Sequence, residues 1–277
     1  MPKCEISNDV EVYWIEEGDP AGPPIVWIHG GSVEESSHAV ADMEPYWSKV
    51  RALYPDARGH GQSSKFVEPK HYTYACKAND LIGWLDFLGV EKALFGGASM
   101  GGALSLYVAA HFPERVTGII SISGPPFEPT PEDREWWAKK RHIVAEGRFG
   151  EFYTENVRLR MGQRAAEKLA KDPERLSRAT RGLRYHTEAS LLALLDETYS
   201  RPNWVDHCRD INCPTLVISG SEDHYPTVAM SREVAETVSD SEFYVIDGGS
   251  HFPNRSHRGQ VQPILTEFID RVLFLAT

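Results

Sequence analysis

The sequence of 277 residues predicts an α/β fold: a mostly parallel sheet of roughly eight strands, with helices on both faces and one inserted helical segment. Short apolar runs typical of buried strands alternate with helix-like segments along most of the chain. A glycine-rich turn joins one such strand directly to an apolar helix. The alternation stops over residues 125–207, where the sequence carries no convincing strand pattern.

The expected elements follow in chain order. Residues 5–16 alternate in polarity, which is typical of an edge strand or hairpin, and glycines and prolines over 18–24 predict a turn. Six apolar runs then predict buried parallel strands over Pro24–Ile28, Arg51–Pro55, Ala93–Gly96, Val116–Ser121, Pro214–Gly220 and Glu242–Ile246. Helices are expected over His38–Val50, over Tyr72–Leu88, directly after Ser99, and over Val261–Leu275.

The segment 125–207 has a different character. It opens with a proline-rich stretch, and glycines and prolines divide residues 132–200 into what we predict to be four or five helices. We therefore expect residues 1–124 and 208–277 to form the core, and residues 125–207 to form an inserted helical cap, or lid.

Aromatic side chains of this expected cap are candidates for a substrate pocket, foremost Trp136, Trp137 and Tyr153. The alternative is that these side chains bury against the body of the protein. The sequence leaves both interpretations open.

The turn at Gly97-Ala98-Ser99-Met100-Gly101 is the most informative motif of the chain. It has the Gly-x-Ser-x-Gly pattern of a nucleophile elbow, between an apolar strand and an apolar helix. The glycines permit a turn so tight that Ser99 presents its hydroxyl above the sheet. A serine hydroxyl is a weak nucleophile by itself, so the motif predicts a base and an acid elsewhere.

Two late loops supply the candidates. Asp223 follows a buried-strand pattern and is the candidate acid, with Glu222 and Asp247 as alternatives. His251 follows the next strand pattern through a glycine-rich loop and is the candidate base, with His257 as the alternative. The chain order is therefore Ser, Asp, His.

In these motifs the chain resembles the α/β-hydrolases, in particular the cap-bearing, esterase-like kind. Further landmarks are His29-Gly30-Gly31 after an early strand and the segment 56–63 after the next. The resemblance covers nearly the whole chain outside residues 125–207. It implies an oxyanion hole formed by the backbone N–H groups of Gly31 and Met100, with Ser32 beside the substrate.

The resemblance implies a serine hydrolase that cleaves a small carboxylic ester or lactone through an acyl-enzyme on Ser99, without a cofactor. A serine at this position argues against epoxide hydrolases and haloalkane dehalogenases, which would carry Asp. The enzymatic alternatives are a C–C bond hydrolase of ring-cleavage products, a cofactor-free haloperoxidase and an acyltransferase. The non-enzymatic alternative is a ligand receptor that retains the triad.

Composition excludes several other classes. The net charge of −11 argues against non-specific nucleic-acid binding. No apolar run reaches the roughly 20 residues that span a membrane, and no secretory signal is evident, so a cytoplasmic protein is the default expectation. His207, Cys208 and Cys213 lack a fourth ligand, so no metal site is predicted. The four cysteines have no disulfide-like spacing, and the oligomeric state stays open.

Overall fold

The structure, a computed structural model, describes residues 2–7, 9–31, 34–161 and 163–275. Its central element is one eight-stranded sheet in the order β1-β2-β4-β3-β5-β6-β7-β8. The first pairings, β1 with β2 and β2 with β4, are antiparallel, and all others are parallel. The strands are β1 Lys3–Ser7, β2 Val10–Gly18, β3 Pro24–Ile28, β4 Arg51–Pro55, β5 Ala93–Ala98, β6 Val116–Ile122, β7 Thr215–Gly220 and β8 Ser241–Ile246. The predicted fold class is confirmed.

Side chains of successive strand residues enter two separate core layers, as the period of two of a strand requires. In β3, Val26 and Ile28 face one layer while Ile25 and Trp27 face the other. Helices cover both faces, which explains why the parallel strands are apolar throughout. They are α1 (Ser36–Met43), α2 (Tyr74–Phe87), α3 (Met100–His111), α9 (Val228–Thr237), α10 (Pro253–Ser256) and α11 (Arg258–Asp270).

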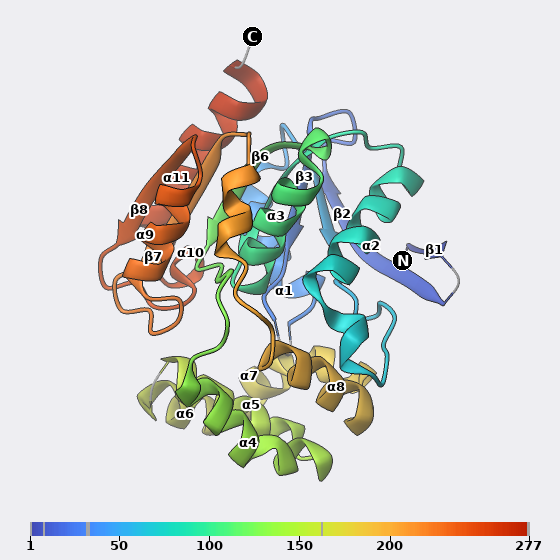
Figure 1. The fold of residues 1–277 in the computed structure, drawn as a ribbon, viewed down its shortest axis with the longest axis vertical. Coiled ribbons are helices and arrows are strands. Elements are labelled where there is room, and N and C mark those ends of the chain that lie inside the picture. The colour runs from blue at the N-terminus through green and yellow to red at the C-terminus, as the bar shows by residue number, and fades with distance from the viewer. Residues whose placement is uncertain (1, 8, 32–33, 162, 276–277) are drawn as a thin grey trace.

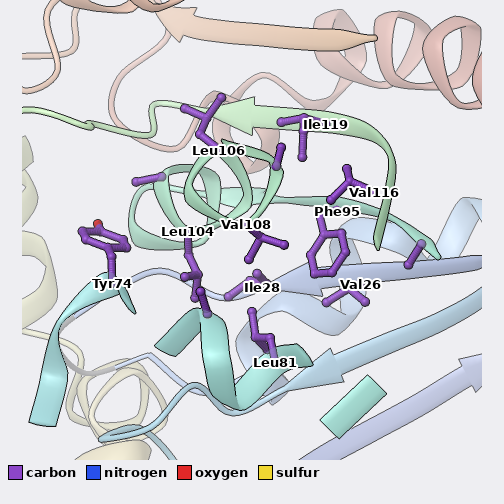
Figure 2. Packing of buried hydrophobic residues seen from close by; sticks show 14 of the residues in the cluster. Val26, Ile28, Tyr74, Leu81, Phe95, Leu104, Leu106, Val108, Val116 and Ile119 are labelled. Carbon is purple, nitrogen blue, oxygen red and sulfur yellow. The ribbon is translucent and has the colours of Figure 1, made fainter. Parts of the chain in front are cut away.

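Helices α2, α3 and α9 contribute to the first layer, and α1 and α11 contribute to the second (Figure 1). Figure 2 shows the first layer at α3, where Leu104 and Val108 of α3 gather with Ile28 of β3 and Leu81 of α2. This packing fixes α3 against the sheet next to the strand end that carries Ser99.

A helical insertion separates β6 from β7. Its helices lie together at one end of the sheet, opposite the C-terminus (Figure 1). They form their own apolar cluster, which includes Phe152 and Leu191 and reaches Tyr72 of the core. The inserted helices are α4 (Pro131–Ala145), α5 (Phe149–Met161), α6 (Gln163–Ala170), α7 (Pro173–Ala179) and α8 (Glu188–Thr198).

Two helices differ from the sequence-based prediction at their ends. The helix expected to reach Val50 stops at Met43 and continues as a 3-10 turn over Glu44–Tyr46, because Pro45 lacks the N–H that an α-helix needs. The closing helix begins at Arg258 and ends in a π-helical turn over Arg271–Leu275. Over the described residues, no helix has the length and apolar character needed to cross a membrane.

Packing around Gly96 of β5 yields a stability prediction. A Cβ atom at this position would lie 2.5 Å from Cζ3 of the buried Trp27 and 3.1 Å from Cβ of Ile120. We expect Gly96→Ala to lower the free energy of unfolding by about 1–3 kcal/mol, because neither neighbour has room to move. Equilibrium urea denaturation measures the change.

Gly259→Ala is the matched control, since a Cβ atom there meets nothing within 4 Å. We expect this variant to gain about 0.5 kcal/mol from the reduced freedom of the unfolded chain. Equal stabilities of the two variants would contradict the packing argument.

Candidate active site

Ser99 occupies the turn between β5 and α3 in a strained conformation, with φ 55° and ψ −118°. The neighbouring glycines are required by the close approach of β3. A Cβ atom on either Gly97 or Gly101 would collide with the carbonyl oxygen of Ile28. The N–H of Ser99 donates to the carbonyl of Ile122 at 2.8 Å, so the turn is also tied to β6.

The predicted base and acid lie beside this turn. Nε2 of His251 lies 2.9 Å from Oγ of Ser99, and Nδ1 of His251 lies 3.0 and 3.1 Å from the two carboxylate oxygens of Asp223. Both partners are buried. An ionised carboxylate only accepts hydrogen bonds, so Nδ1 of His251 carries a proton and, in the neutral ring, Nε2 accepts one from Ser99.

Asp223 is held in its ionised form. Burial by itself raises the pKa of the Asp223 carboxyl group. The neighbouring His251 and its hydrogen bond lower this pKa by more than burial raises it, so the pKa lies below its ordinary value. The N–H of Tyr225 donates a further hydrogen bond to Asp223 at 3.2 Å.

The alternative candidates lie elsewhere. Glu222 and Asp247 are exposed on the surface. The Nδ1 atom of His257 is hydrogen-bonded to the hydroxyl of Ser256 at 2.9 Å. Of the residues weighed from the sequence, the structure thus brings together Ser99, His251 and Asp223.

Backbone donors lie near the serine hydroxyl. Met100 is the first residue of α3, where N–H groups have no partner within the helix. Gly31 lies next to it, since a Cβ atom on Gly31 would be 3.4 Å from Cβ of Met100. Ser32, predicted to be beside the substrate, lies outside the described residues.

A cavity of about 130 Å³ opens at this point, lined by Ser99, His251, Gly31 and Met100. The inserted helices close its far side with Tyr153, among others. The parallel sheet places the loops after β3, β5, β7 and β8 at one edge, where binding sites of open α/β sheets form.

Of the aromatic candidates for this pocket, Trp136 and Trp137 lie instead in the apolar cluster of the inserted helices, which was the alternative interpretation. The Nε1 atom of Trp137 donates to Asp196 at 2.9 Å, and its ring stacks on Tyr199. Trp136 packs against Phe152 and Tyr199. The physical reason is that α4 must bury its aromatic face against α5 and α8, which leaves these rings unavailable to the cavity.

Comparison with known proteins identifies the family to which this architecture belongs. Residues 23–257 match the family model described as alpha/beta hydrolase fold. The chain belongs to this family. The resemblance predicted from the motifs is therefore confirmed at the level of the superfamily.

Relatives of this α/β-hydrolase carry different activities by name. A putative non-heme chloroperoxidase from Synechocystis is 27% identical and aligns over 96% of this chain and 97% of its own. The 3-oxoadipate enol-lactonase 2 of Acinetobacter baylyi is 30% identical over 76% and 74% of the two chains. The crystal structure of an enol-lactonase from Burkholderia xenovorans has a TM-score of 0.81 at 23% identity, covering 97% and 99% of the chains, which shows the shared fold.

The loop that carries Gly30 and Gly31 is anchored by a partly exposed ion pair that the sequence did not reveal. Glu34 accepts a hydrogen bond from the N–H of Gly30 at 2.8 Å and pairs with the guanidinium of Arg255. Burial by itself raises the pKa of Glu34. The charge of Arg255 and the hydrogen bonds to Glu34 outweigh this effect and lower the pKa to about 2. The loop that carries Gly31 is thus held by charge.

Other polar residues of the cavity wall were also missed: Lys77, Glu197 and Arg201. The one available signal was the position of Lys77, four residues before the buried Leu81 on the same helix face. Among the described residues, no group of three His, Cys, Asp or Glu side chains is arranged to hold a metal.

We expect Glu34→Gln to lower the free energy of unfolding at pH 7 by about 1 kcal/mol, because the partly exposed Arg255 loses its direct carboxylate partner and keeps only the more distant Asp42, at 3.8 Å. The pKa of Glu34 is lower in the folded chain, so its contribution is complete above pH 4.5, the ordinary value, and is lost as pH falls toward 2. Urea denaturation of both proteins at several pH values measures the difference.

Glu174→Gln serves as the control, since Glu174 is exposed and lies 4.0 Å from its partner Arg178. We expect a change below about 0.5 kcal/mol there. A difference between wild type and Glu34→Gln that persists undiminished from pH 7 to pH 3 would refute the ion-pair explanation.

Proposed function

We propose that this α/β-hydrolase cleaves a small carboxylic ester or lactone through an acyl-enzyme on Ser99. The observation that carries the proposal is the unbroken hydrogen-bond chain from Asp223 through His251 to Ser99 at the wall of a cavity. The similarity to a 3-oxoadipate enol-lactonase supports the choice of an ester bond within a small molecule.

In the first step, Oγ of Ser99 attacks the carbonyl carbon while Nε2 of His251 takes its proton. Asp223 holds the imidazole in the required tautomer and stabilises the imidazolium that forms. His251 then gives this proton to the departing alkoxide. A water molecule attacks the acyl-enzyme with His251 again as the base, which releases the acid and restores Ser99.

The negative charge on the carbonyl oxygen needs donors that are already in place. We assign this role to the backbone N–H groups of Met100 and Gly31, two neighbouring residues that line the cavity together with Ser99. The helix dipole of α3 favours the same charge at its first turn. Because backbone atoms act here, the side chain of Met100 is free to vary.

The inserted segment 125–207 acts as the cap of this site in our proposal. Tyr153 of α5 and Thr198 of α8 line the cavity opposite the core loops, so these helices enclose the substrate. Enclosure sets the substrate choice, while the chemistry belongs to residues of the core.

The relationship to a putative non-heme chloroperoxidase makes a cofactor-free haloperoxidase the second candidate. Halogenation of a test substrate in the presence of peroxide and halide, compared with ester hydrolysis by the same preparation, distinguishes the two activities.

Replacement of the nucleophile tests the main proposal. We expect Ser99→Ala to lower kcat for 4-nitrophenyl acetate by about 10⁴-fold or more, because the acyl-enzyme no longer forms. An organophosphonate should add once per chain to the wild type, at Ser99, as read by mass spectrometry. Ser256→Ala, which alters an exposed hydroxyl, is the control and should keep its activity. Adduct formation at another residue would refute the assignment.

Replacement of Asp223 tests the proposed acid of the Ser99–His251–Asp223 triad. We expect Asp223→Asn to fold normally and to lose about 10⁴-fold in kcat, because the imidazole then adopts the wrong tautomer. Asp247→Asn removes an equal charge from an exposed loop position and should have little effect. The opposite ranking of these two variants in steady-state assays would show that the acid was chosen wrongly.

A further inference from the structure

The wall of the cavity contains two cations with different partners. Lys77 of α2 is only 3% exposed. Its ammonium group lies 3.8 Å from a carboxylate oxygen of Glu197 and donates to the carbonyl of Tyr72. Its charge is therefore balanced within the protein.

Arg201 follows α8 and lines the same cavity. Its nitrogens donate to neutral acceptors: the carbonyls of Phe127 at 3.3 Å and Thr198 at 3.5 Å, and the hydroxyl of Tyr225 at 3.5 Å. Within the described part of the chain, no carboxylate forms a salt bridge with Arg201. These contacts are long, and they leave donors of the guanidinium unused.

Among the described residues, neither carboxylate of the cavity wall forms a salt bridge with Arg201. Glu197 lies beside Lys77, and Glu34 is paired with Arg255. Arginine stays protonated at any physiological pH, so Lys77 and Arg201 share the single negative charge of Glu197, and one positive charge is left over. A partly buried charge of this kind is stabilised when a ligand supplies its partner.

The surroundings hold the guanidinium in position. The ring of Tyr74 lies 6.0 Å from Cζ of Arg201. The hydroxyl of Tyr225 is itself fixed, since it lies 2.9 Å from the carbonyl oxygen of Phe127 and 2.8 Å from that of Glu128. A planar guanidinium presents parallel N–H groups that match the two oxygens of a carboxylate.

We propose that Arg201 binds a carboxylate group of the substrate, so that the substrate is an anionic ester or lactone carrying a free carboxylate besides the bond that is cleaved. This inference rests on the proposed function of the Ser99 site, and it adds the substrate class.

Matched esters test the inference by turnover. One pair places the charge on the acyl part, 4-nitrophenyl hydrogen glutarate against 4-nitrophenyl valerate. The other places it on the alcohol part, 4-acetoxybenzoate against 4-methylphenyl acetate. We expect kcat/KM of the wild type to favour the anionic member of at least one pair by about tenfold or more. Arg201→Gln should remove that preference.

Arg209→Gln is the charge-matched control, because Arg209 is exposed on the surface and pairs with Asp206. It should keep the preference. Arg201→Lys, which retains a charge without the fork, should keep part of it. If Arg201→Gln does not fold, the inference is tested by the kcat/KM ratios of the wild type within each ester pair and by the Arg201→Lys variant. Equal kcat/KM within both pairs, or an equal loss for neutral and anionic esters in Arg201→Gln, would overturn the inference.

Binding without turnover separates this inference from the proposed function. Isothermal titration of the Ser99→Ala protein with the same four esters should show tighter binding of the anionic member, and adding Arg201→Gln should abolish the difference. If the wild type hydrolyses no ester while this difference is present, the proposed function fails and the carboxylate subsite stands. If esters are cleaved through Ser99 but the anionic and neutral members bind equally, only the subsite fails.

Discussion

The geometry of the site depends on the crowded contact between the Ser99 turn and the end of β3. Ser99 adopts a positive φ that costs on the order of 1–3 kcal/mol for a residue with a side chain. The turn persists because Gly97 and Gly101 let the backbone press against the carbonyl of Ile28, and because β6 accepts the N–H of Ser99. Burial of β3, β5 and β6 between two apolar layers supplies the stability that offsets this strain.

Buried polar groups then hold the neighbouring loops. Asp56, directly after β4, accepts hydrogen bonds from the N–H groups of Ser36 and Gln62 at 2.7 Å each. Arg58 donates to both carboxylate oxygens of Asp80 on α2. These contacts join the loop after β4 to helices on both faces of the sheet. A site with fixed loops has less conformational entropy to lose when a substrate binds.

The inserted helices contain two kinds of surface. One is the apolar cluster around Phe152, Trp137 and Leu191, which holds the helices to one another. The other faces the cavity and carries polar groups such as Asn156 and Glu197. The first surface stabilises the insertion, and the second meets the core loops over Ser99.

Local sequence patterns were sufficient for the sheet, the turn at Ser99 and the loops after β7 and β8, because apolar periodicity and glycine spacing act over short distances. The contacts between side chains from distant segments could not be predicted in this way. That Asp223 rather than Asp247 meets His251, that Trp137 turns into the helical cluster, and that Arg201 faces the cavity without a carboxylate partner follow from packing between elements far apart in the chain. The sequence by itself determined the architecture and the reactive motif. Tertiary structure alone decided which charged side chains are paired with one another, since a pairing depends on the distance between two side chains in space.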